Sequence, residues 1–179
     1  ASDVYKRQNL SSSRALKDVT EAYGQQYHAA AVGEVNVVAE MKRTHSVIGG
    51  EGNGGVIYPE SHYGRDALVG VGLFLSHYVA QSKKMTELKS TYPPYFISKN
   101  KMTLSPDMDV DKILEGLKER YATEKVTDID GVKIDFAQGW VHLRKSNTEP
   151  IIRIYSEAKD EAAANQLTEE VIAAAKSTL

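Results

Sequence analysis

Apolar residues recur at helical and strand spacings in the first half of the chain. The pattern predicts helices at residues 14–23, 34–43 and 67–81, and strands at 45–48 and 56–58. In the second helix Val35, Val38 and Met41 recur every three residues and predict its apolar face. The third helix is apolar nearly all round, which predicts that it is buried, and Asp66 can cap its N-terminus.

A pair of prolines, Pro93 and Pro94, separates this half from the rest, because proline fixes φ and ends helices. The formal charge changes nearby, from +2 in residues 1–99 (11 basic, 9 acidic) to −4 in residues 100–179 (11 basic, 15 acidic). We therefore predict two domains, with a boundary after residue 94.

The second half has the order strand, helix, strands, helix. The pattern predicts strands at residues 96–104, 132–136, 140–143 and 151–156, and helices at 109–121 and 161–177. A sheet with two helices in about 80 residues indicates a small two-layer α+β fold.

Composition excludes several classes of protein. The 22 basic and 24 acidic residues give a net charge of −2, so no electrostatic reason to bind nucleic acid or an anionic membrane is evident. The longest apolar stretch has about 14 residues, whereas a membrane-spanning helix needs about 20. The 179 residues include no cysteine, which excludes a disulfide scaffold and a thiolate metal site, fits a reducing compartment, and leads us to expect a cytoplasmic protein.

The first segment that could carry chemistry is GGEGNGG at residues 49–55. It satisfies G-x-G-x-x-G, but a dinucleotide site needs a helix directly after the loop, and residues 56–58 look extended. The alternative interpretation is a glycine-rich turn that presents Glu51 and Asn53 to a ligand. A carboxylate accepts hydrogen bonds from neighbouring hydroxyls, and an amide both donates and accepts. A plain surface hairpin fits the same pattern.

The second segment is RKSNTEP at residues 144–150, between two predicted strands. Its guanidinium, ammonium, hydroxyl and amide groups are the donors that a phosphate dianion prefers, and backbone N–H groups in such a turn add to them. Arg153 and Glu157, on the next strand, could brace this loop. Ser, Asn and Thr are also common in ordinary polar hairpin loops.

A metal site is not expected in this chain. The five histidines show no ligand spacing. Asp107, Asp109 and Asp111 spell D-x-D-x-D, but they directly precede a predicted helix, and we interpret them as acids that stabilise its N-terminus.

On these two loops the chain resembles the α-D-phosphohexomutase family of phosphoglucomutases, phosphomannomutases and phosphoglucosamine mutases. GGEGNGGVIYPESHYGRD is similar to the sugar-specificity loop of the family's third domain, and RKSNTEPIIRIYSEA to the phosphate-binding loop of its fourth. The resemblance covers roughly residues 9–179. It implies a truncated mixed α/β domain III at residues 9–94 and a TATA-binding-protein-like α+β domain IV at residues 95–179.

The resemblance also implies roles for the loop residues. Glu51 and Asn53 would hold sugar hydroxyls. The residues that would hold the substrate's non-transferred phosphate are Arg144, Ser146, Asn147 and Thr148, with Arg153 beside them. Many relatives carry Ser and His where this chain has Asn53 and Gly55, so the resemblance supplies no base from this loop.

The family's chain is longer than this one and has four domains. Its phosphorylated serine and its D-x-D-x-D magnesium loop lie in the first two domains, and neither motif occurs here. We therefore interpret the chain as the C-terminal half, which contains no catalytic residue and should be inactive alone. Residues 1–8 are polar where the family has an apolar strand, and we interpret them as a non-family tail.

The resemblance implies that the intact protein is an isomerase that moves phosphate between O6 and O1 of a hexose phosphate. Phosphoserine, magnesium and a hexose 1,6-bisphosphate would take part, and the missing N-terminal domains would be this chain's partner. Glucosamine phosphate is the favoured substrate, and glucose and mannose phosphates stay open. The alternatives are a non-catalytic sugar-phosphate-binding module and a structural domain with degenerate loops.

Overall fold

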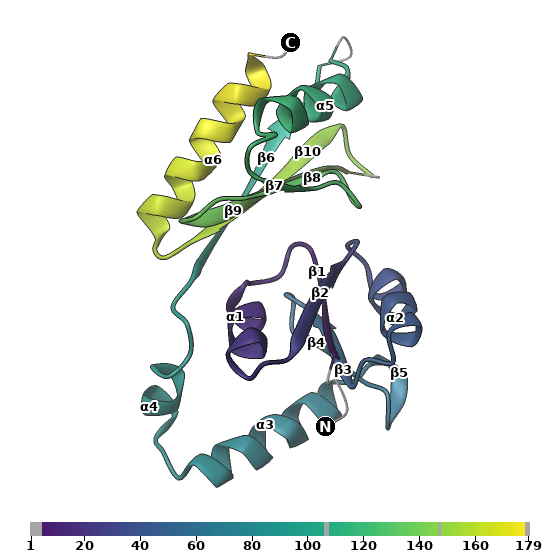
Figure 1. Ribbon diagram of the computed structural model, residues 1–179, viewed down its shortest axis with the longest axis vertical. Coiled ribbons are helices and arrows are strands. Elements are labelled where there is room, and N and C mark those ends of the chain that lie inside the picture. The colour runs from purple at the N-terminus through teal and green to yellow at the C-terminus, as the bar shows by residue number, and fades with distance from the viewer. Residues whose placement is uncertain (1–4, 106–107, 147, 178–179) are drawn as a thin grey trace. The chain divides into compact units, whose positions relative to one another are not determined.

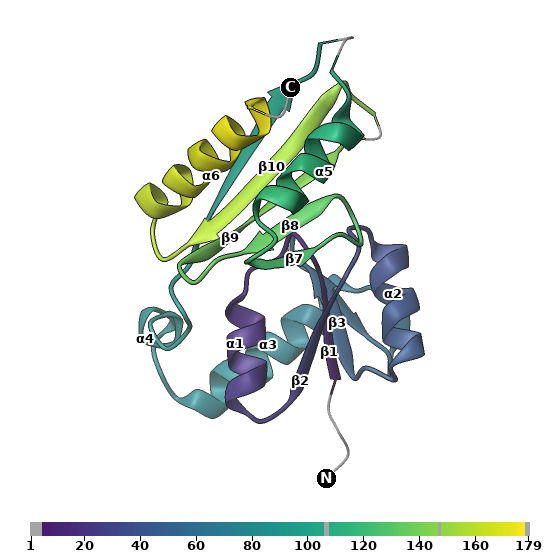
Figure 2. The same cartoon turned by 45° about the horizontal axis from the view of Figure 1, so that its top comes forward.

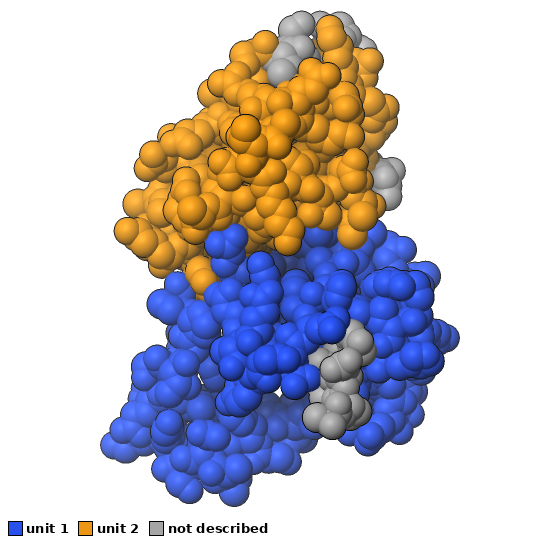
Figure 3. Space-filling view, viewed as in Figure 1, with its two compact units in different colours: residues 1–94 blue, residues 95–179 orange. Residues whose placement is uncertain are grey.

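The computed structural model describes residues 5–105, 108–146 and 148–177. The chain forms two compact units, Ala1–Pro94 and Tyr95–Leu179 (Figure 3). Each unit has its own five-stranded sheet with helices packed on it (Figure 1). The expected fold class, a mixed α/β part followed by a smaller α+β part, is confirmed.

The sheet of the first unit has the strand order β2-β1-β3-β4-β5. Its strands are β1 (Tyr5–Asn9), β2 (Gln26–Ala30), β3 (Ile48–Glu51), β4 (Gly55–Tyr58) and β5 (His62–Arg65). The central strand β1 runs parallel to β2 and β3, whereas β3, β4 and β5 form antiparallel pairs. The helices α1 (Ala15–Ala22) and α2 (Glu34–Arg43) lie on opposite faces of this sheet (Figure 2).

Residues 5–8 belong to the sheet, in contrast to the expectation that the domain begins at residue 9. Strand β1 pairs with neighbours on both sides. Its sequence, YKRQN, gave no sign of this, because strands at the centre of parallel sheets are usually apolar. The predicted strand at 45–48 is also misplaced: β3 begins at Ile48, and His45 lies before it with φ 51°.

The helix α2 has the predicted bounds but a different buried face. Val37 and Met41 are fully buried, whereas Val35 is 81% exposed. Residues three apart on an α-helix fall about 60° short of a full turn, so a run of three such positions spreads around the helix. The two buried residues are four apart and contact Ile57 and Ala30 in the core of this unit.

The helix α3 (Ala67–Gln81) also has the predicted bounds, but the prediction that it is buried is wrong. None of its residues is buried; Leu68 is 84% exposed and Val79 is 74% exposed. The side of the helix at Gly70 contacts Val56 of β4. Asp66 caps the helix as predicted, because its carboxylate accepts a hydrogen bond from the N–H of Val69 at 2.9 Å. A short helix, α4 (Met85–Lys89), follows.

The second unit is a sheet covered on one face by two helices, as the sequence predicted (Figures 1 and 2). Its antiparallel strands have the order β6-β10-β9-β8-β7. They are β6 (Phe96–Thr103), β7 (Lys125–Thr127), β8 (Val132–Asp135), β9 (Gly139–Lys145) and β10 (Ile151–Ala158). The helices α5 (Val110–Arg120) and α6 (Glu161–Lys176) bury their apolar stripes against Ile152 and Ile154 of β10 and their neighbours. In the described part of the chain, no helix combines the length and apolar character needed to cross a membrane.

Candidate functional site

The glycine-rich segment forms the hairpin between β3 and β4. Gly54 takes φ 94°, a conformation that favours glycine, and its N–H donates to the carbonyl of Glu51 at 3.1 Å. At Gly50 a Cβ would run into the carbonyl oxygen of Gly55 on the facing strand. A strand and not a helix follows the loop, so the segment is a hairpin and does not fit a dinucleotide loop.

Glu51 lies at the end of β3 with its side chain 7% exposed. The amide nitrogen of Asn9 donates to its Oε1 at 3.0 Å, and the guanidinium of Arg65 lies 3.7 Å from its Oε2. Both carboxylate oxygens are therefore oriented, and each keeps a lone pair for a further donor. Asn9 is itself fixed by Ser12, whose hydroxyl donates to its Oδ1 at 2.7 Å.

The partners of Glu51 were missed by sequence reasoning. Asn9 is 42 positions away, and no local pattern links the two residues. Arg65 is anchored in turn by Glu34, with an Nε–Oε2 distance of 2.7 Å. The N–H of Arg65 and then its guanidinium hold the pKa of Glu34 below its usual range.

Asn53, the second predicted sugar ligand, has a different environment from Glu51. It is exposed at the tip of the hairpin, and its Oδ1 accepts a hydrogen bond from the N–H of Gly55 at 3.1 Å. A cavity of about 210 Å³ lies beside the hairpin and is lined by residues 48–51 and 54–56 with Gln8 and Leu16. Glu51 is therefore in this cavity wall, and Asn53 is not.

The second predicted loop connects β9 to β10. Ser146 is buried, and its N–H donates to the carbonyl of Ile151 at 3.0 Å. The N–H of Thr148 lies 3.5 Å from the Ser146 hydroxyl, and the side chain of Thr148 is exposed. Asn147 lies outside the described residues.

Two arginines meet at the base of this loop. Arg144 on β9 and Arg153 on β10 are cross-strand partners. The Nε of Arg144 is buried and has no hydrogen-bond partner among the described residues. Arg153 contacts the loop through Glu149, with an Nη2–Oε2 distance of 3.0 Å. Glu157 does not brace the loop; it is buried and accepts a hydrogen bond from the indole of Trp140 at 2.8 Å.

No cluster of three or more His, Asp or Glu suited to a metal ion occurs in the described ranges. In the D-x-D-x-D run, Asp109 caps α5: its Oδ1 accepts from the N–H groups of Asp111 and Lys112 at 3.0 and 3.1 Å. Asp107 lies outside the described residues. The carboxylate of Asp109 is thus engaged in capping a helix.

Comparison with protein families matches both units. The family described as "Phosphoglucomutase/phosphomannomutase, alpha/beta/alpha domain III" matches residues 7–95, starting inside β1. The family described as "Phosphoglucomutase/phosphomannomutase, C-terminal domain" matches residues 99–174.

Curated relatives match along most of the chain. A phosphoglucosamine/phosphogalactosamine mutase from Sulfurisphaera tokodaii is 37% identical, over 90% of this chain and 36% of the relative. A phosphoglucomutase/phosphomannomutase from Thermococcus kodakarensis is 36% identical, over 89% of this chain and 35% of the relative. The chain thus spans about a third of the length of these relatives.

A solved structure has the same fold. It is a phosphoglucomutase/phosphomannomutase family protein from Burkholderia thailandensis, with a TM-score of 0.79 and 21% identity, over 98% of this chain and 38% of that one.

Proposed function

Because the chain belongs to the phosphoglucomutase/phosphomannomutase family, we propose that it is the sugar-phosphate-binding part of a phosphohexomutase. It spans about a third of its relatives, so the isomerase activity would belong to a longer protein. The observation that carries the proposal is the buried Nε of Arg144, which has no hydrogen-bond partner among the described residues and lies at the base of the loop similar to the family's phosphate loop. A buried guanidinium nitrogen without a partner is costly unless a ligand supplies an acceptor.

The phosphate would be held by the loop between β9 and β10. Arg144 offers a planar fork of N–H donors that matches phosphate oxygens. The hydroxyls of Ser146 and Thr148 and the amide of Asn147 would add neutral donors, and Arg153 would contribute a second positive charge. The ion pair of Arg153 with Glu149 ties that arginine to the same loop.

The sugar would be recognised by the β3–β4 hairpin. Asn9 and Arg65 hold the Glu51 carboxylate in one orientation at the cavity wall. That carboxylate would accept hydrogen bonds from two neighbouring sugar hydroxyls, and Asn53 would complete the contact after a small movement of its exposed side chain. Glucosamine phosphate is the favoured substrate, because the Sulfurisphaera tokodaii relative is a phosphoglucosamine/phosphogalactosamine mutase. Glucose and mannose phosphates remain alternatives, in line with the Thermococcus kodakarensis relative.

In the intact protein, phosphate would move between O6 and O1 of the hexose by way of a phosphoserine outside this chain and a hexose 1,6-bisphosphate. Magnesium, bound elsewhere in that protein, would neutralise charge on the transferred group. This chain's own contribution would be positioning, which accounts for much of the catalysis of phosphoryl transfer.

A chimera tests the proposal. This chain would replace the matching C-terminal third of the Sulfurisphaera tokodaii relative, and mutase activity would be assayed on glucosamine, glucose and mannose 6-phosphates. We expect turnover of at least one of them, with a large loss in Glu51→Gln and Ser146→Ala. A control variant, Glu60→Gln, alters an exposed carboxylate in the turn between β4 and β5 and should leave activity unchanged. A chimera that is folded and as stable as the relative, yet turns over none of the three sugars, would refute the proposal.

A further inference from the structure

The helix α3 has two apolar sides, and contacts within this chain cover one of them. The side at Gly70 contacts Val56 of β4. On the other side Leu68, Leu75 and Val79 are each at least 50% exposed. Successive residues of an α-helix turn by about 100°, so these three side chains fall within about 40° of one another and roughly opposite Gly70. They form one apolar row, about 17 Å long.

Gly72 lies in the same row, between Leu68 and Leu75. Glycine inside a helix is unfavourable relative to alanine, and it is used where another group must approach the backbone closely. Gly70 has such a neighbour, because a Cβ there would lie 3.2 Å from the side chain of Val56. A Cβ at Gly72 would meet no atom of the described residues within 4 Å. The space at Gly72 therefore suits a partner whose backbone approaches α3 closely.

The row has the spacing of a contact between two helices. Its members, Leu68, Gly72, Leu75 and Val79, are separated by four, three and four residues, the alternation that places side chains along the seam with a second helix. The 15 residues of α3 include no lysine, arginine, aspartate or glutamate, whereas the 11 residues of α5 include six. Exposed apolar surface of this kind marks an interface, and its partner must be apolar as well.

The layer of the first unit that contains α3 is incomplete. The buried apolar core of this unit lies on one face of the sheet, where Ile57 packs with Val37 and Met41 of α2. Val56, the neighbour of Ile57 on β4, projects from the other face, and it is only half-buried although it contacts α3. The family description that matches residues 7–95 names α/β/α layers. Further apolar structure is therefore expected on the face that carries α3.

The comparisons point to the source of this structure. The chain covers 36% of the Sulfurisphaera tokodaii relative, so more than half of a protein of that length lies outside these 179 residues. We propose that the α3 row packs against an apolar helix from that remainder. The partner helix would lie along α3 with its backbone closest at Gly72 and its apolar side chains against Leu68, Leu75 and Val79. This packing does not depend on whether either loop binds a sugar phosphate.

Leucine at the two glycines tests whether the row is open in this chain. Gly72→Leu should leave the midpoint of urea unfolding unchanged or raise it, because leucine favours a helix and meets no described neighbour at that position. Gly70→Leu is the matched control and should lower the midpoint, since its side chain would collide with Val56. Circular dichroism gives both midpoints. A lower midpoint in Gly72→Leu as well would mean that the row is already packed within this chain, which overturns the proposal.

Thiol labelling tests for the partner helix in the longer protein. The chain has no cysteine, so Leu75→Cys and Glu60→Cys each introduce one thiol, the first in the row and the second in the exposed turn between β4 and β5. Both variants are made in the 179-residue chain and in the chimera described above, and mass spectrometry follows alkylation of the introduced residue by iodoacetamide. We expect the thiol at position 75 to react at least tenfold more slowly in the chimera than in the chain, and the thiol at position 60 to react equally fast in both.

The outcomes of the labelling separate the possible occupants. Equal rates at position 75 in a folded chimera would overturn the proposal. Slow reaction in the 179-residue chain that becomes faster on dilution would show that a second copy covers the row, and would also overturn it. Adding Gly72→Leu to the chimera should restore fast labelling at position 75, because the partner backbone loses its place beside α3. Labelling needs no substrate, so a folded chimera that is inactive on all three sugars but protects position 75 would refute the proposed function and still support the packing of α3.

Discussion

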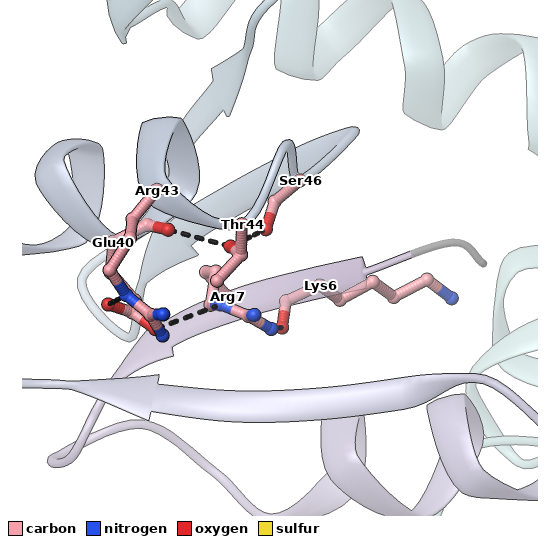
Figure 4. A network of polar contacts seen from close by, with 6 residues as sticks. All are labelled: Lys6, Arg7, Glu40, Arg43, Thr44 and Ser46. Atoms are coloured by element: carbon pink, nitrogen blue, oxygen red, sulfur yellow. Dashed lines mark hydrogen bonds and ion pairs between the residues drawn. The ribbon is translucent and has the colours of Figure 1, made fainter.

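Arg7 places a full positive charge at the centre of the first sheet. Its side chain is completely buried, its Nη1 donates to the carbonyl of Lys6 at 3.1 Å, and its Nε lies 3.7 Å from Glu40. Figure 4 shows that Arg43 approaches the same carboxylate, at 2.6 Å. A buried ion pair pays a desolvation cost that its attraction often fails to offset, so an apolar side chain of similar size is frequently the more stable choice.

Replacing Arg7 by methionine should therefore stabilise the first unit. We expect Arg7→Met to raise its free energy of unfolding by about 1–3 kcal/mol, because Glu40 is partly exposed and keeps Arg43 as its partner. Urea unfolding followed by circular dichroism measures this value. The control is Arg43→Met. The side chain of Arg43 is 68% exposed, so this replacement should change the free energy of unfolding by less than about 1 kcal/mol. A destabilised Arg7→Met variant would show that the arginine makes a net favourable contribution.

His142 should make the second unit less stable in mild acid. Burial is the main cause that lowers its pKa, so below about pH 6.5 the unfolded chain binds a proton more readily than the folded one. The free energy of unfolding should therefore be at its highest above pH 7 and should decrease as the pH drops from 7 toward 5. His142→Gln should remove most of this fall.

Fluorescence of Trp140 isolates the effect of His142. It is the chain's single tryptophan, is fully buried in β9, and therefore reports on the second unit, in which His142 is the single histidine. The same pH dependence in His142→Gln and in the parent chain would assign the fall to carboxylates instead.

At the residue scale, sequence reasoning identified candidate ligand-binding residues but not the side chains that hold them in place. Glu51 and Arg144 lie in segments that are rich in glycine or in polar side chains, and this composition indicates a binding loop. Asn9 and Arg65, which orient Glu51, come from other elements and are brought to it by strand pairing. The pairing register between strands that are distant in the sequence cannot be predicted from a local sequence pattern.

At the element scale, α3 is the clearest mismatch between apolar character and burial. Its composition correctly predicts a helix but does not specify what covers it. Contact with β4 involves the side at Gly70, and large apolar side chains elsewhere on the helix, such as Leu68 and Val79, are exposed. The amphipathic helix α5 gave a better prediction, because it buries Ile113 and Leu117 on the side that the spacing indicates.

A matched pair of leucines in the first unit tests the exposure of α3. Leu68 is 84% exposed, and Leu88, in α4, is 1% exposed. Leu88→Ala should lower the free energy of unfolding by about 2–5 kcal/mol, as for other buried leucines. Leu68→Ala should change it by less than about 0.5 kcal/mol. Urea unfolding by circular dichroism gives both values, and a comparably large loss for Leu68→Ala would mean that the helix is covered in solution.

Strands were predicted less well than helices where their sequences are polar. β1, β2 and β5 lack a run of β-branched or apolar residues, so nothing in YKRQN, QYHAA or HYGR indicates a strand. The strands β8, β9 and β10 alternate apolar and polar residues or carry apolar runs, and were found with small errors at their ends.

At the scale of the whole molecule, the chain consists of two units that each have a core. The apolar cluster of the second unit draws only on residues between Met102 and Ala175. A sheet of five strands with two helices packed on one face satisfies the usual requirement for independent stability. We therefore propose that residues 95–179 form a domain that folds alone.

Expression of residues 95–179 by themselves tests this domain boundary. We expect dispersed amide signals and a cooperative urea transition of Trp140 fluorescence, with a midpoint near that of the full chain. A shorter piece, residues 105–179, lacks β6 and should fail to fold, because β10 loses one of its two neighbours. If the piece of residues 95–179 is unfolded, the second unit requires the first unit in order to fold.

We propose that the β3–β4 hairpin binds the hydroxyls of a hexose phosphate and that the 144–150 loop binds phosphate. The most direct test is an NMR titration of the ¹⁵N-labelled chain with glucosamine 6-phosphate, read at the amides of residues 49–55 and 144–148. We predict saturable shifts in both loops, with Glu51→Ala suppressing those in the hairpin and Ser146→Ala those in the second loop. A folded chain in which neither loop responds to glucosamine, glucose or mannose 6-phosphate would contradict the account.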